Sequence, residues 1–189
     1  MAFLGDAPET ADARALYDDD RSSYGYVMDL SHLWAHHPPA HQQLFALLEE
    51  LVEAGGLTLR QRGILVAACA STIGDSYCAL AWGGKLATVA DPDLAAAVLT
   101  GTDDGLSPAE RALATWARAV ARDPNATTAD DVEELRAAGW TDRQIFAITT
   151  FVALRAAFSA VNDALGAVPD PELRAGVPLQ VRDAVTWGR

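Results

Sequence analysis

Cys78 is the residue in this chain whose type and position best suit nucleophilic chemistry. It follows Gly74 and Asp75, a pair that typically ends one helix and caps the next. The sulfur is then placed in the first turn of a helix, where the positive end of the helix dipole favours a thiolate. We therefore predict Cys78 as the catalytic nucleophile, with Asp75 as its catalytic neighbour.

Three more side chains of the same segment could bind a substrate beside the sulfur: Tyr77, Trp82 and Lys85. Lys85 lies seven residues after Cys78, so helical periodicity brings the two to about the same face. A half-buried pairing of Lys85 with Asp75 would make the pocket polar. The structural alternatives are a Cys78 packed in the core, a Trp82 that is a core or interface aromatic, and a solvated Lys85.

Two helices must position this site. The first is predicted from Thr58, which forms a capping box with Gln61, to Ile73. The second begins after Asp75. Cys69, the other cysteine, lies in the alanine-rich first helix and is predicted to be a small core residue rather than a disulfide partner. Unpaired thiols are typical of a reducing compartment, so we expect a cytoplasmic protein.

Apolar periodicity and helix-start signals predict the other helices, and the helix over 39–53 should pair antiparallel with the one that begins at Thr58. In the last long helix, Arg155 is a charge in an apolar face and needs a carboxylate partner if it is buried. The predicted helices cover 11–17, 24–34, 39–53, a short one from 92, 108–123, one from 128, and 141–165. The inward residues expected in the last are Ile145, Ile148, Val152, Phe158 and Val161.

The sequence contains an internal repeat. Residues 49–61 and 133–144 share a pattern at an offset of 83, which superposes Thr58 on Thr141 and Gln61 on Gln144. Two similar helix-turn-helix units are therefore expected in one domain. Because the second unit carries Val161 at the position of Cys78, only the first unit can hold thiol chemistry.

The segment LTLRQRGILVAACASTIGDSYCALAWGGKLA at 57–87 is similar to the signature region of the AhpD-like family, which includes carboxymuconolactone decarboxylases and peroxidase-related proteins. HPPAHQQLFALLEEL, LSPAERALATWARAVARDP and DVEELRAAGWTDRQI resemble the peroxidase-related branch. The resemblance covers 24–168 and implies an all-α AhpD-like helical bundle with two helix-turn-helix units in a homo-oligomer. Residues 1–23 are then an N-terminal arm, and 169–189 a docked C-terminal tail.

In redox members of that family the motif is a glutamate, a Cys-x-x-Cys pair and a histidine. Those positions fall on Gly63, Asp75, Cys78 and Trp82 here, so one of the four is kept. The resemblance implies an antioxidant, peroxiredoxin-type reduction of an organic hydroperoxide through Cys78 alone, with an external thiol reductant. The alternative is a non-redox enzyme of lactone decarboxylase type, or a small-molecule binding module, that uses the Asp75, Cys78 and Trp82 pocket. Neither reading implies a cofactor.

Composition and charge exclude several classes of binding partner. The formal net charge of −12 repels phosphate backbones, so no nucleic acid is expected. The first twenty residues lack a basic region and an apolar region, and no long uninterrupted apolar run occurs, so we expect neither a secretory leader nor a membrane span. The histidines lack a completing cysteine or carboxylate, and we expect no metal. They are His32, His36, His37 and His41.

Overall fold

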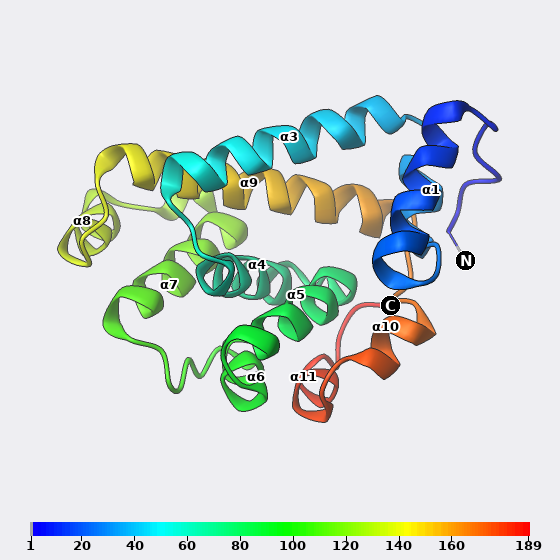
Figure 1. The fold of residues 1–189 in the computed structure, drawn as a ribbon. Coiled ribbons are helices and arrows are strands. Elements are labelled where there is room, and N and C mark those ends of the chain that lie inside the picture. The colour runs from blue at the N-terminus through cyan, green and yellow to red at the C-terminus, as the bar shows by residue number, and fades with distance from the viewer. Residues whose placement is uncertain (1) are drawn as a thin grey trace.

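The computed structural model describes residues 2–189. In this range the chain forms eleven α-helices, one short 3-10 helix and no β-strand (Figure 1). The longer helices are α1 (Ala11–Tyr24), α3 (Pro38–Gly55), α4 (Leu59–Ile73), α5 (Ser76–Val89), α7 (Pro108–Arg122) and α9 (Asp142–Ala164). The shorter ones are α2 (Asp29–Trp34), α6 (Pro92–Thr100), α8 (Ala129–Ala137), α10 (Pro171–Gly176) and α11 (Leu179–Ala184). The predicted all-α fold is confirmed.

Local side-chain hydrogen bonds set the helix ends around the site. The Thr58 hydroxyl accepts from the N–H of Gln61, whose side chain accepts from the N–H of Thr58, and this capping box starts α4. Gly74 ends α4 with a φ of 82°, a left-handed conformation that glycine adopts without strain. Asp75 then caps α5. The helix junction predicted from the sequence is therefore present.

Helix α4 is the centre of the bundle. Eight consecutive residues, 63–70, are buried, because α5, α6, α7 and α9 all pack on this helix. Gly63 permits the close approach of α5, since a Cβ at this position would lie 3.0 Å from Cβ of Leu86. The close crossing holds α4 and α5 in a fixed relation, and with them the junction that carries Cys78.

The repeat is visible in the structure. Both units begin their second helix with a Thr and Gln capping box, and Gln144 Nε2 donates to Gly55 O at 3.1 Å, which ties one unit to the other. The units differ at the next turn. In the first unit this helix ends at Gly74. The second unit has Ala157 at the equivalent position, and its helix α9 continues for 23 residues in all. The break alone gives the first unit a new helix start beside its cysteine.

Two packing predictions are wrong. Helix α3 lies along α9 rather than along α4, because α4 is already covered by its four other neighbours (Figure 1). Val161 is 38% exposed rather than inside, since Ser159 and Asn162 take the buried positions at that end of α9. Asn162 is held there by the indole N–H of Trp34, which donates to its Oδ1 at 2.9 Å.

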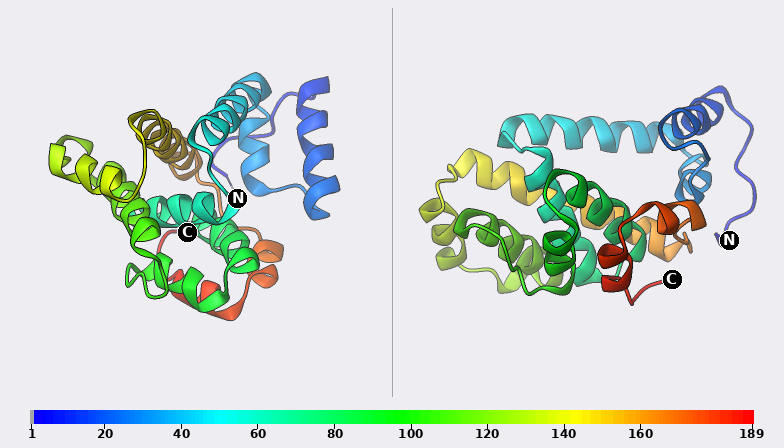
Figure 2. Two further views of the ribbon diagram at one scale, coloured as in Figure 1. Left: turned by 60° about the vertical axis from the view of Figure 1, so that its left-hand side comes forward. Right: turned by 60° about the horizontal axis from the view of Figure 1, so that its bottom comes forward.

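The two ends of the chain form more structure than predicted. Helix α1 continues seven residues past Tyr17, and Asp20, the last residue of an acidic run, is buried. Its Oδ2 accepts from the N–H of Met28 at 2.9 Å, which accounts for the burial. At the other end, α10 and α11 pack on α5 and α6, at the opposite end of the molecule from α8 (Figure 2). Val181 of α11 is fully buried there.

Helix α9 is long and apolar enough to cross a membrane by length and composition, although no uninterrupted apolar run signals it. In this fold it contacts α3, α4 and α7 instead. Its buried residues include Ile148 and Phe151, so its apolar character is explained by packing in the core of the bundle.

Candidate functional site

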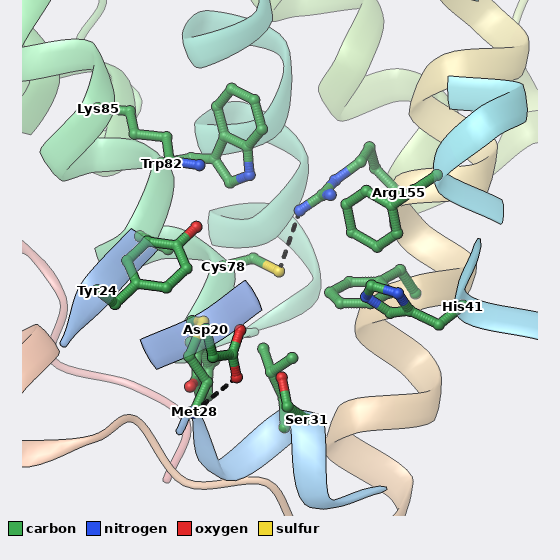
Figure 3. Close-up of a pocket in the computed structure, with 14 residues that line it drawn as sticks. Asp20, Tyr24, Met28, Ser31, His41, Cys78, Trp82, Lys85 and Arg155 are labelled. Atoms are coloured by element: carbon green, nitrogen blue, oxygen red, sulfur yellow. Dashed lines mark hydrogen bonds between the residues drawn. The ribbon is translucent and has the colours of Figure 1, made fainter. Parts of the chain in front are cut away.

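A pocket of about 170 Å³ lies between α5 and α9 and is also lined by residues of α1, α2 and α3 (Figure 3). All five site residues predicted from the sequence belong to α5 or its cap, and four of them, Tyr77, Cys78, Trp82 and Lys85, line this pocket. The fifth, Asp75, lies beneath it. The other charged, polar and aromatic residues of the lining are Asp20, Tyr24, Ser31, His41, Phe45, Arg155 and Phe158.

Cys78 is in the first turn of α5. Its N–H donates to Oδ1 of Asp75 at 2.9 Å, and only 2% of the residue is exposed. Nη2 of Arg155 donates to the Cys78 sulfur at 3.4 Å. The thiol thus lies between a buried carboxylate on its own helix and a buried guanidinium from α9.

Arg155 has no carboxylate partner, so the sequence-based expectation of one is wrong. Within residues 2–189 its only hydrogen bond goes to the Cys78 sulfur, and its Nε has no partner. The guanidinium carbon instead lies 5.4 Å from the ring centroid of Trp82 and 5.0 Å from that of Phe158. Aromatic faces attract a cation but leave its N–H donors unused.

Opposing effects act on the thiol. Burial raises the pKa of Cys78, Arg155 lowers it, and the Asp75 carboxylate raises it further. The sum lies well above the usual cysteine range, so the thiol is protonated at neutral pH. Burial also raises the pKa of Cys69 to about 11, and neither cysteine forms a disulfide. Cys69 is a core residue that lines no part of this pocket.

The predicted binding residues have different surroundings. Trp82 is partly buried, and the amine of Lys85 lies 4.9 Å from the centroid of its ring. Lys85 is exposed at the mouth of the pocket and makes no salt bridge with Asp75, which is fully buried. The Tyr77 hydroxyl donates to Oδ2 of Asp170, so this side chain offers its ring rather than its hydroxyl to the pocket.

Asp20 and His41 are among the pocket residues that sequence reasoning did not assign to the site. The His41 ring lies tilted relative to the rings of Phe45 and Phe158, at centroid distances of 4.4 and 6.4 Å. Burial lowers its pKa, so the imidazole is neutral at pH 7. Helical spacing could not identify either residue, because both come from helices distant in sequence from Cys78. In residues 2–189 no three His, Cys, Asp or Glu side chains gather as metal ligands.

No protein-family model matches the chain, and no curated protein matches it in sequence. Solved structures match it in fold. An alkylhydroperoxidase AhpD core structure, an uncharacterized peroxidase-related protein from Ralstonia eutropha JMP134, is 24% identical, with a TM-score of 0.79 over 91% of this chain and 94% of that one. A peroxidase-related protein from Silicibacter sp. TM1040 is 19% identical, with a TM-score of 0.78 over 91% and 93%.

A third solved structure of this fold has a ligand. The debrominase Bmp8, with one cysteine replaced by alanine and in complex with 2,3,4-tribromopyrrole, is 17% identical, with a TM-score of 0.72 over 92% of this chain and 95% of that one. These matches show that the chain has the all-α fold of the AhpD core, as the sequence resemblance implied. In this chain the fold forms a pocket in which one cysteine lies beside one arginine.

Proposed function

We propose that the protein is a single-thiol oxidoreductase that reduces a small organic hydroperoxide at Cys78. The observation that carries this proposal is the contact between Nη2 of Arg155 and the Cys78 sulfur inside an aromatic-lined pocket. A guanidinium beside a sulfur stabilises the thiolate as it forms, and the thiolate is the nucleophile in thiol chemistry. The AhpD fold, with its peroxidase-related members, supports the same reading.

The reaction balances with one thiol. The Cys78 sulfur attacks the terminal oxygen of the hydroperoxide and the O–O bond breaks, giving a sulfenic acid and an alcohol that takes up the thiol proton. An external thiol then condenses with the sulfenic acid and releases water, and a second external thiol releases Cys78 with formation of a disulfide. The external reductant is required because Cys69 lies outside the pocket and Asp75 cannot resolve a sulfenic acid.

A second candidate is a non-redox role, and the raised pKa of Cys78 favours it. A thiol kept protonated is a poor nucleophile, and such a pocket would bind a small molecule, or act on a lactone by acid-base chemistry. The brominated ring bound by one protein of this fold is consistent with either role.

Hydroperoxide consumption separates the two candidates. With cumene hydroperoxide and excess dithiothreitol, the wild-type protein is expected to turn over, the Cys78→Ser variant to lose that activity, and the Cys69→Ser variant to keep it. If the wild-type protein consumes no more hydroperoxide than Cys78→Ser does, the redox proposal is wrong and the binding role replaces it.

A further inference from the structure

Arg155 has hydrogen-bonding capacity that the protein does not use. The residue is 4% exposed, and of the five N–H donors of a guanidinium one is directed to the Cys78 sulfur. In residues 2–189 no carboxylate lies within salt-bridge distance of it, and Nε is buried without a partner. A buried cation without an anion is costly, so an anionic ligand would find an unoccupied, matched partner here.

Charges around the pocket are segregated. Figure 3 shows Arg155, Trp82 and Lys85 on one side of Cys78 and Asp20 on the other. The Asp20 carboxylate accepts a hydrogen bond from the Met28 N–H, which holds it on its own side. An anionic group therefore has a favoured end, next to the two cations.

The other carboxylate near the sulfur, Asp75, accepts from the Cys78 N–H and does not line the pocket. His41 adds no positive charge, because burial lowers its pKa. Arg155 is thus the buried cation that faces a ligand, with the exposed Lys85 at the entrance.

The size and walls of the pocket specify the remainder of the ligand. Its volume of about 170 Å³ is close to that of the cavity of about 150 Å³ in another protein that binds benzene. Trp82 and Phe158 are the aromatic residues of the lining next to the guanidinium, and Phe45 extends the apolar wall. These dimensions fit one aromatic ring with a small substituent.

We propose that this pocket binds a small aromatic molecule carrying one carboxylate, which pairs with the free N–H donors of Arg155 while the ring lies against Trp82 and Phe158. Arginine is suited to this role because its planar fork matches a carboxylate in a two-point contact. The proposal adds the substrate class to the thiol chemistry proposed above and rests on that chemistry for the reaction: the hydroperoxide reduced at Cys78 would be carried by an aromatic molecule that also bears the carboxylate. The binding step needs no reactive thiol.

A matched pair of probes tests the charge requirement. Benzoate and benzamide have nearly the same shape, and calorimetric titration of the wild-type protein at pH 7.5 should show benzoate binding at least tenfold more tightly than benzamide. Raising the salt concentration should reduce this preference only slightly, because the pair is buried. Equal binding of the two probes, or no binding of benzoate at millimolar concentration, would overturn the proposal.

Two arginine variants locate the charge. Arg155→Met should lose the preference for benzoate and Arg155→Lys should keep part of it. Arg143→Met is the matched control that should retain it, because Arg143 is an exposed residue of α9 that lines no part of the pocket. Circular dichroism establishes that each variant is folded. If Arg155→Met is folded and still prefers benzoate tenfold, another residue binds the carboxylate and the proposal is wrong. If Arg155→Met does not fold, the comparison of benzoate with benzamide on the wild-type protein still tests the proposal.

The Cys78→Ala variant separates this proposal from the redox proposal. It cannot react with hydroperoxide, yet it should keep the preference for benzoate over benzamide. A protein that binds benzoate selectively but consumes no hydroperoxide supports the anion pocket and removes the redox role. A protein that consumes hydroperoxide without preferring benzoate supports the redox role and overturns the anion pocket.

Discussion

Replacing Asp75 by asparagine should make Cys78 more reactive while leaving the fold intact. Asp75 has two effects that this change separates: its Oδ1 caps α5 by accepting from the Cys78 N–H at 2.9 Å, and its charge raises the pKa of the thiol. Asparagine is as good an N-cap as aspartate, so the hydrogen bond is kept and only the charge is lost. The buried Oδ2 of Asp75, which has no partner within residues 2–189, is replaced by an amide nitrogen that carries no charge to desolvate.

The magnitudes follow from these contacts. Nearby charges shift a pKa by about one unit or more, so the thiolate population of Cys78 at pH 8 should rise about tenfold in Asp75→Asn. Unfolding free energy should stay within about 1 kcal/mol of wild type. Asp75→Ala loses the same charge and also the cap, which leaves the Cys78 N–H without a partner and costs about 1–2 kcal/mol.

Iodoacetamide labelling followed by peptide mass spectrometry measures the rate at Cys78 in each protein, and urea unfolding measures stability. Both variants should label Cys78 about ten times faster than wild type, and Asp75→Ala alone should lose about 1–2 kcal/mol relative to Asp75→Asn. Cys69 is the internal standard, because it lies in the core away from the pocket. An unchanged labelling rate in the folded asparagine variant would refute the role assigned to the Asp75 charge.

Three further predictions concern packing, pH and the family motif. Gly83→Ala should cost about 1–3 kcal/mol in urea unfolding, because its Cβ would lie 2.8 Å from Cγ1 of Val181, while Gly176→Ala, with nothing within 4 Å, should be close to neutral. Burial raises the pKa of Asp163 from 3.8 to about 6, so its contribution to stability is full below the unfolded value of 3.8 and lost as pH rises through 6. A pKa shift of this size corresponds to about 3 kcal/mol of stability, and solvent screening of the partly exposed side chain reduces it to about 1 kcal/mol. Asp163→Asn should therefore stabilise the protein at pH 7 by about 1 kcal/mol. A pH series of thermal melts should show no gain below pH 3.8. Gly63→Glu, which would restore the family glutamate, should leave the protein insoluble or unfolded by circular dichroism, since an added Cβ lies 3.0 Å from the nearest side-chain carbon of α5.

Local signals in the sequence predicted the parts of the site that are close together in the chain. Each of these features depends on residues no more than four positions apart: the Thr58 capping box, the left-handed Gly74 and the Asp75 cap. Such short-range chemistry is readable without a structure. The same holds for the second Thr and Gln box, and so the repeat could be recognised.

The predictions that failed concern the residues that face a helix from elsewhere in the fold, which the sequence of the helix itself does not specify. Periodicity correctly placed Arg155 in an apolar face but could not show that it meets a sulfur and two aromatic rings. Asp20 sits in an acidic run typical of a solvated surface, and its burial follows from one backbone N–H eight residues later. His41 likewise enters the pocket only because α3 packs along α9.

The central claim is that Cys78 is the thiol on which the chemistry of this fold takes place. Treatment of the reduced protein with one equivalent of cumene hydroperoxide in the presence of dimedone, followed by peptide mass spectrometry, tests it most directly. We predict a dimedone adduct at Cys78, formed faster in Asp75→Asn, and none at Cys69. An unmodified Cys78 after the hydroperoxide has been consumed, or equal labelling of both cysteines, would contradict the account.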